Sequence, residues 1–470
     1  MPAPAKNPAS GAVPPRDAGA PEWTAMSLAC DRRLATTASP PASTSAARIA
    51  ASPASKPQLR MSSAPVPVEP LAFPSASPAP APPSHSGALS RRVLLAGGVT
   101  AALFPLSGFA EETILEAVKL PGGGVGYGGA SPGPTLRCYY AKPVQLTLVN
   151  RLDVPAPFSW VGLRLPGPPV EPLAPGERRA VTFTPREAGF GLYGAFGSPD
   201  LWAGGLFGPV FVENLGSRPP DSDMTVVFSG ADAATLRADA GPGPLRLDAA
   251  EGERVRLRFA NASPETFVAL VARQPVQVVA IDGQPCEMFQ PNGGALPLAP
   301  TARFEVLFDV SDQPTEFVLA GARDAIVRIV PSGEGQRPGP PIAPLHPNTD
   351  LPAAIALERA LRVKVAMTGV GPYAIAGAKP LFRAARGQPV VVTLTNQTPT
   401  PQTLRLEGHC ARILHALDDG WDPYWRDTLY LEPGRKLLAA FVADNPGLWP
   451  LASASPERRA KGLATWFVVS

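Results

Sequence analysis

The stretch KPVQLTLVNRLDVPAPFSWVGLRL (142–165) contains a turn, an alternating apolar strand that ends in asparagine, a short loop and a second strand. The same plan returns in GERVRLRFANASPETFVALVA (252–272) and in GQPVVVTLTNQTPTPQTLRLEGH (387–409). Self-similarity at intervals of about one domain indicates a repeated architecture. The sequence therefore predicts three related β-domains in tandem.

The rest of the chain from residue 111 onward supports this interpretation. Short runs that alternate between apolar and polar residues are separated by turns rich in Gly, Pro, Asn and Asp, a pattern typical of all-β sandwiches and barrels. We place the three β-domains at 111–216, 217–343 and 344–470. The linkers are SRPPDSD (217–223) and the Pro/Gly-rich segment at 331–352.

Composition excludes several classes of function. The chain has 470 residues, 45% of them hydrophobic, and a formal net charge of +3, which is too small to steer it toward nucleic acid. The part expected to fold contains no apolar run of about 18 residues, so we expect no membrane span in the mature protein. We expect a monomer.

The first 110 residues differ in composition from the rest. Residues 1–89 are rich in Ala, Pro and Ser, and we predict a disordered leader because such a segment buries too little apolar surface to fold. Residues 90–110 contain Arg91 and Arg92, a Gly/Ala-rich apolar stretch and small residues at its end, which together indicate a twin-arginine export signal and a periplasmic protein. The alternatives are an accidental arginine pair and a membrane anchor, which the interrupting Gly and Pro residues disfavour.

Three cysteines lie beyond the leader, namely Cys138, Cys286 and Cys410. An odd number allows at most one internal disulfide. Because each cysteine lies in an apolar, strand-like context, we predict three buried free thiols.

Several short motifs, in order along the chain, resemble landmarks of the three-domain multicopper oxidases, the family that includes laccases. This resemblance implies three cupredoxin-like Greek-key domains. It also implies a type 1 copper and a trinuclear copper cluster, held by about ten histidines and one cysteine from two motifs in the first domain and two in the third, because imidazole and thiolate suit copper. The motifs are SPGPTLR (131–137), SWVGLRLPG (159–167), GLFGPVFVEN (205–214), AIDGQP (280–285), DGWDPYWRDT (419–428) and DNPGLW (444–449).

The four ligand motifs of the family have counterparts here that lack its ligands. Where the family has His-Trp-His-Gly, Tyr-His-x-His, His-Pro-Met-His-Leu-His-Gly and His-Cys-His with a further His and Met, this sequence has other residues. A serine, for example, replaces the thiolate. The vacated positions are Ser159, Val161, Gly194, Phe196, Gln402, Arg405, Glu407, Ala452, Ser453, Ala454, Arg458 and Leu463.

Few alternative ligands remain. Beyond the leader the only histidines are His346, His409 and His415, whereas a trinuclear cluster of the family's type needs eight. His409, Cys410 and His415 are weak candidates for a different metal site, but neighbours on a strand point to opposite faces. We therefore predict no metal site, no cofactor and no catalytic residue.

Arg405 and Glu407 are two residues apart on a predicted strand, so they share a face. By the resemblance, this face is the one that looks into the copper cavity. We expect the two side chains to pair with each other or with a nearby charge, because an unpaired buried charge is costly. The alternative is an ordinary exposed strand face.

Three functions are consistent with these observations. The first is a copper-free periplasmic protein, similar to the SufI-type branch of the family, that binds unknown envelope proteins in cell division or envelope maintenance. The second is an oxidoreductase of the multicopper oxidase type with a nonstandard or degenerate copper site. The third is a small-molecule binding module that uses the emptied cavity. We expect the first, although function does not follow from fold.

Overall fold

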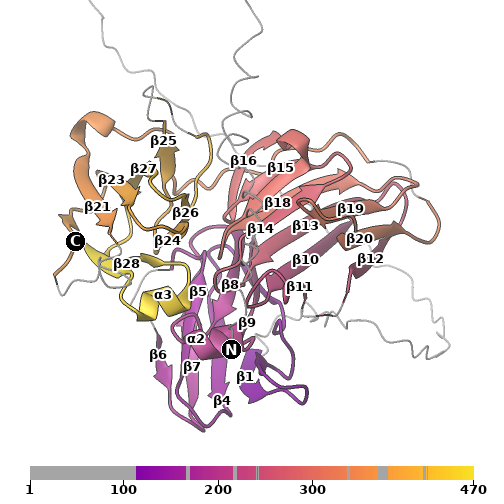
Figure 1. The fold of residues 1–470 in the computed structure, drawn as a ribbon, viewed down its shortest axis with the longest axis horizontal. Coiled ribbons are helices and arrows are strands. Elements are labelled where there is room, and N and C mark those ends of the chain that lie inside the picture. The colour runs from indigo at the N-terminus through magenta and orange to yellow at the C-terminus, as the bar shows by residue number, and fades with distance from the viewer. Residues whose placement is uncertain are drawn as a thin grey trace, which may run out of the picture. The chain divides into compact units, whose positions relative to one another are not determined.

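The computed structural model describes residues 113–165, 170–214, 220–239, 241, 243–335, 339–368, 379–415, 420 and 422–470. Strands dominate this part of the chain, so the all-β prediction is confirmed (Figure 1). The predicted leader and the export signal with Arg91 and Arg92 lie outside the described residues. Among the described residues, no helix has the length and apolar character needed to cross a membrane.

The first sheet pair, indigo to magenta in Figure 1, has the strand orders β2-β1-β4-β7 and β3-β9-β8-β5-β6. Apolar residues from both sheets, such as Leu115, Leu146 and Val210, form one buried core between them. Its elements are β1 (Thr113–Lys119), β2 (Val125–Tyr127), β3 (Leu136–Tyr139), β4 (Val144–Asn150), β5 (Ala156–Val161), β6 (Val170–Leu173), β7 (Arg178–Phe183), β8 (Gly189–Gly194), α2 (Pro199–Ala203) and β9 (Phe207–Glu213).

The second sheet pair has the orders β11-β10-β13-β18-β15-β16 and β12-β20-β19-β14-β17. Leu257, Leu270 and Phe317 belong to its shared core. Its elements are β10 (Ser222–Ser229), β11 (Arg237–Ala238), β12 (Leu245–Ala249), β13 (Arg254–Asn261), β14 (Val268–Ala272), β15 (Gln277–Ile281), β16 (Gln284–Phe289), the 3₁₀ turn η1 (Asn292–Gly294), β17 (Ala295–Leu298), β18 (Arg303–Asp309), β19 (Thr315–Leu319) and β20 (Ala325–Pro331).

The third sheet pair has the orders β21-β23-β27-β25 and β22-β29-β28-β24-β26. The predicted domain boundaries stay predictions; they fall between one sheet pair and the next. The elements are η2 (Leu357–Arg359), β21 (Leu361–Met367), β22 (Arg383–Ala384), β23 (Gln388–Asn396), β24 (Gln402–Leu406), β25 (Arg412–Leu414), β26 (Thr428–Leu431), β27 (Lys436–Ala443), β28 (Gly447–Ser453), α3 (Pro456–Ala460) and β29 (Ala464–Val469).

An asparagine closes the same strand in each sheet pair, at the end of β4, β13 and β23. Asn150, Asn261 and Asn396 are each 0% exposed. Each Nδ2 donates to two backbone carbonyls, and each Oδ1 accepts from the backbone amide two residues later. A buried amide with all these partners fixes the loop that follows the strand. The repeat seen in the sequence is therefore a repeated hydrogen-bonding device.

Arg303 at the start of β18 joins all three sheet pairs. Its guanidinium is fully buried and donates four hydrogen bonds, to the carbonyls of Phe190 at 3.1 Å, Thr301 at 2.7 Å and Asp282 at 2.8 Å, and to the Asp427 carboxylate at 2.9 Å. Phe190 lies in the first sheet pair and Asp427 in the third. Every sheet pair thus contributes an acceptor or a donor to this one contact.

Two residues from the quoted motifs complete the contact. Gly162 has φ +95° and packs against Arg303 so closely that a Cβ atom would lie 2.6 Å from Cζ of the guanidinium. Only glycine provides both this backbone conformation and this space. The Asp282 carboxylate accepts backbone amides of Asp427 at 3.2 Å and Thr428 at 3.0 Å, which ties the second sheet pair to the third.

The three cysteines Cys138, Cys286 and Cys410 are buried and free, as predicted. Burial raises the pKa of all three thiols, that of Cys138 and Cys286 to about 12. They therefore remain protonated and pack as small apolar groups.

Candidate metal centre

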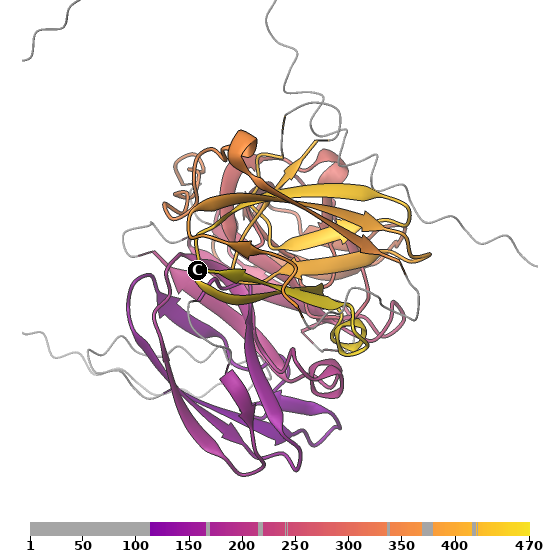
Figure 2. The same ribbon diagram turned by 90° about the vertical axis from the view of Figure 1, so that its left-hand side faces the viewer.

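The vacated ligand positions come together from the first and third sheet pairs. Ser159 and Val161 lie on β5, Gly194 ends β8 and Phe196 follows it. Gln402 and Arg405 lie on β24, and β28 next to it carries Ala452 and Ser453. Glu407 follows β24, Ala454 follows β28, Arg458 lies on α3, and Leu463 follows this helix. Helices α2 and α3 are in contact, as Figure 2 shows for the magenta and yellow coils.

The two positions on β5 and the two near the end of β8 are closed by packing and by the sheet itself. Ser159 pairs with Gly194 across the ladder, and its Oγ donates to the Gly194 carbonyl at 3.2 Å. Val161 is 0% and Phe196 2% exposed, in an apolar cluster with Trp202. These positions present a hydroxyl that is already bonded and apolar groups, none of which is a copper ligand.

The positions on β28 carry short side chains. Ala452 and Ala454 are 0% and 1% exposed, and each offers only a methyl group. The Ser453 hydroxyl accepts the backbone amide of Ser455 at 3.1 Å, which begins the turn into α3. Ser453, at the position of the family's thiolate, therefore helps to end strand β28.

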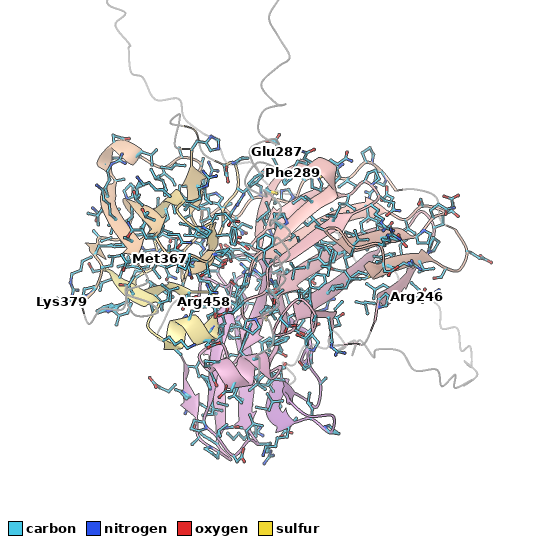
Figure 3. The ribbon with its side chains drawn as sticks, in the orientation of Figure 1. Arg246, Glu287, Phe289, Met367, Lys379 and Arg458 are labelled. Atoms are coloured by element: carbon cyan, nitrogen blue, oxygen red, sulfur yellow. The ribbon has the colours of Figure 1, made fainter. Side chains whose placement is uncertain are left out.

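Three further vacated positions, in the third sheet pair, are also filled. Arg458, labelled in Figure 3, donates from Nη1 to the Gln402 side-chain oxygen at 2.9 Å and pairs with Glu265 of the second sheet pair at 3.0 Å. Gln402 in turn donates to the Thr398 hydroxyl at 2.9 Å. Leu463 is buried in the core of the third sheet pair. All polar groups here have partners within the protein.

Arg405 and Glu407 pair as predicted, with 3.8 Å between Nη1 and Oε1. Their side chains are 3% and 21% exposed, so the alternative of an ordinary exposed strand face is wrong. Glu407 also pairs with Arg459, and both arginines lie over the Phe196 ring, at 5.2 Å and 5.6 Å from its centre. Charged and aromatic groups thus occupy these vacated positions.

The three residual candidates do not converge. His409 contacts Phe441, Trp449 and Phe467, whereas Cys410 packs into a different apolar cluster. Both residues lie between β24 and β25 and not on a strand as expected. His415 lies elsewhere, with Nε2 3.1 Å from the Asp422 carboxylate.

Burial lowers the pKa of His409 to about 4, against the opposing attraction of Asp444, whose Oδ1 lies 3.8 Å from Nε2. The imidazole is therefore neutral, the form that binds metals. Both ring nitrogens are already engaged, Nδ1 with the Glu407 carbonyl at 3.3 Å and Nε2 with the Asn445 amide at 3.4 Å.

Sequence reasoning missed a buried ionic network beside His409. Arg164 pairs with Glu187 through two hydrogen bonds of 2.8 Å and 2.7 Å, and it reaches Asp444 in the third sheet pair at 2.9 Å. Arg186 binds the same Asp444 oxygen at 3.1 Å. The only signal in the sequence is a charged residue within the apolar motif SWVGLRLPG.

These residues do not fit the family's copper centres. Throughout the described ranges, no group of three or more His, Cys, Asp and Glu side chains is arranged to hold a metal ion. The polar groups at the vacated positions bond to one another and to neighbouring protein groups, apart from the Arg405 Nε, which has no partner, and the remaining positions are apolar.

Comparison with known proteins identifies the family of two regions. Domain models described as multicopper oxidase match residues 112–216 and residues 356–470. These two regions are multicopper oxidase domains. The matched regions correspond to the first and third sheet pairs, the two that carry the vacated positions.

Relatives of this multicopper oxidase homologue are distant. It is 24% identical over 423 residues to the multicopper oxidase MmcO of Mycobacterium tuberculosis, covering 72% of this chain and 82% of the relative. It is 26% identical over 220 residues to the multicopper oxidase mco of Staphylococcus aureus, covering 40% of this chain and 48% of the relative.

Solved structures show the same fold. A multi-copper oxidase from Pseudomonas thermotolerans matches with a TM-score of 0.68 at 23% identity, over 77% of this chain and all of the other, 100%. Lac15 from a marine microbial metagenome matches with a TM-score of 0.65 at 26% identity, and the match covers 76% of this chain and 100% of Lac15. The three sheet pairs are therefore cupredoxin-like, as predicted.

Two predictions need correction. The prediction of a copper-free binding protein in cell division is wrong, because the matching relatives and structures are named as multicopper oxidases and laccases and favour an oxidase. The prediction of no cofactor is wrong for the same reason, since copper is the cofactor that this family implies. Sequence reasoning inferred the first from the domain plan, the export signal and the lost ligands, and the second from the lost ligands and the small number of histidines. The misfit of the vacated positions then leaves the location of any copper open.

Proposed function

We propose that this chain is an oxidoreductase of the multicopper oxidase type whose metal site differs from that of its relatives. One observation carries the proposal: multicopper oxidase models match both regions in which, by the resemblance, the family places its copper ligands. The names of the relatives agree with it. Because the vacated positions do not fit copper, no step of the reaction is assigned to them.

Of the residual candidates, the His415 region is the most open to an added metal. The His415 side chain is 30% exposed and pairs with one oxygen of Asp422, whose other oxygen is bound by Arg426 at 3.1 Å, whereas the His409 side chain is 0% exposed. Imidazole and carboxylate together form a metal-capable pair. His415 and Asp422 are therefore the residues that would hold a metal in this region.

Copper loading tests this proposal directly. We expect the purified protein to bind copper stoichiometrically by elemental analysis and to consume oxygen with a phenolic substrate. His415→Ala should reduce both, whereas His346→Ala, a change at the exposed linker histidine, should reduce neither. Absence of bound copper together with absence of oxygen consumption in the wild type would refute the proposal.

We also propose that the protein is exported to the periplasm by the twin-arginine route, on the basis of Arg91 and Arg92. Changing both to lysine should leave the precursor in the cytoplasm, as measured by cell fractionation. Equal periplasmic amounts of the wild type and the variant would contradict this.

A further inference from the structure

Arg405 is a buried cation without adequate partners. Its side chain is 3% exposed, its Nε has no hydrogen-bond partner, and its Nη1 lies 3.8 Å from Glu407, beyond hydrogen-bonding distance. A guanidinium has five N–H donors, and leaving them unbonded inside a protein is expensive. Its ring contact with Phe196 offsets part of this cost.

Two other deeply buried arginines, Arg303 and Arg164, are well supplied with acceptors. Arg303 donates four hydrogen bonds and Arg164 donates three, each including a carboxylate within 2.9 Å. Arg405 is as deeply buried as Arg164, whose side chain is 2% exposed, but it lacks such a carboxylate. The Nε atoms of Arg256 and Arg426 are also buried without a partner, but each of these side chains binds a carboxylate, at 2.7 Å and 3.1 Å. Arg405 differs from them because its nearest carboxylate, that of Glu407, lies 3.8 Å away.

The charges around Arg405 do not remedy the deficit. Glu407 is shared with Arg459, which pairs with the same carboxylate oxygen and lies over the same Phe196 ring. Burial lowers the pKa of Arg405, and the positive charges of Arg303 and Arg459 act in the same direction against the attraction of Glu407 and Asp427. A negatively charged ligand would satisfy the free donors and relieve this repulsion.

The neighbouring side chains restrict the size of such a ligand. Arg405 pairs across the ladder with Ala452, so a methyl group lies beside it on the same face. Phe196 covers another side. An enclosed site favours small monovalent anions, since large or doubly charged ones cost more to desolvate.

We propose that the Arg405 guanidinium binds a small monovalent anion of the chloride or formate class, among the vacated ligand positions. The inference goes beyond the proposed oxidoreductase function and does not depend on it, because anion binding is measured without turnover. The site uses the side chain that replaces a ligand, so the substitution converts a metal-binding position into an anion-binding one.

Thermal unfolding provides the first test. Sodium chloride should raise the midpoint of the wild type in a saturable manner, by about 2 °C at ten times Kd, whereas sodium gluconate at equal ionic strength should not. Arg405→Met should abolish the chloride effect. Arg412→Met, at an arginine that lies over Trp425 on the other sheet of this pair, should retain it. An identical response to both salts in the wild type would overturn the proposal.

A second measurement does not depend on the stability of a variant. Crystals of the wild-type protein soaked in sodium bromide should show an anomalous peak within hydrogen-bonding distance of the Arg405 guanidinium. A water molecule at that position, with no anomalous signal, would overturn the proposal. If Arg405→Met does not fold, Arg405→Lys replaces it, and we expect weaker chloride stabilisation because one ammonium replaces the planar fork.

Discussion

Arg303 and Arg405 are both fully enclosed, and their surroundings differ in one respect. Burial by itself lowers the pKa of each, but Asp427 and Asp282 outweigh burial at Arg303 and raise its pKa, whereas Glu407 does not outweigh it at Arg405. A buried cation with matched acceptors stabilises the structure that supplies them. A buried cation without matched acceptors does not stabilise the fold in this way, and it is available to bind an anion.

The largest effect is expected at Arg303. Arg303→Met removes four hydrogen bonds and leaves the Asp427 carboxylate buried without its cation, so the free energy of unfolding should fall by about 4–5 kcal/mol. Urea unfolding measures this. Arg246→Met, at an arginine whose side chain is 64% exposed, should change it by less than about 0.5 kcal/mol. Equal losses of unfolding free energy in Arg303→Met and Arg246→Met would show that burial and hydrogen bonding do not decide the contribution of an arginine.

Arg164 extends the comparison to a contact between two sheet pairs only. Arg164→Met should lower the free energy of unfolding by about 3 kcal/mol, because Glu187 and Asp444 lose their shared cation. The matched control is Arg137→Met, since Arg137 pairs with Glu213 at 2.7 Å but is 47% exposed. Its loss should cost less than about 1 kcal/mol, and a larger cost would show that burial does not decide the difference.

His409 tests the same rule for a group that burial keeps neutral. Its pKa is about 4 in the folded state against an ordinary value of 6.5, so the unfolded chain takes up the proton first as the pH falls. Stability should be unaffected by this group above pH 6.5 and should fall by up to about 3 kcal/mol between pH 6.5 and 4.

Urea titrations across this range measure the effect on stability. His409→Gln should flatten the dependence, whereas His415→Gln, at a partly exposed histidine, should preserve it. An unchanged slope in His409→Gln would assign the pH dependence to other groups.

The smallest effect is expected at Arg405. In chloride-free buffer Arg405→Met should change the free energy of unfolding by less than about 1 kcal/mol in either direction, since Glu407 keeps Arg459 and few bonds are lost. A loss of about 3 kcal/mol or more would show that Arg405 acts like Arg303 and would remove the contrast between them.

Much of the fold could be predicted from local pattern. Alternation predicted the strands, and the repeated asparagine indicated the three equivalent loops that Asn150, Asn261 and Asn396 close. The pairing of Arg405 with Glu407 was predictable because two residues on one strand share a face. The function was not predictable from ligand loss alone, because the comparisons favour an oxidase.

The sequence by itself determined the all-β architecture and the identity of every residue at the vacated ligand positions. It could not show that Gly162, Asp282 and Asp427, from three separate motifs, meet at Arg303, nor that Arg405 receives too few acceptors. Periodicity specifies which face of a strand is buried, whereas the contacts of Arg303 with Phe190 and Asp427 join residues more than 100 positions apart along the chain. Whether a buried charge is satisfied depends on those distant partners, and only the tertiary structure brings them together.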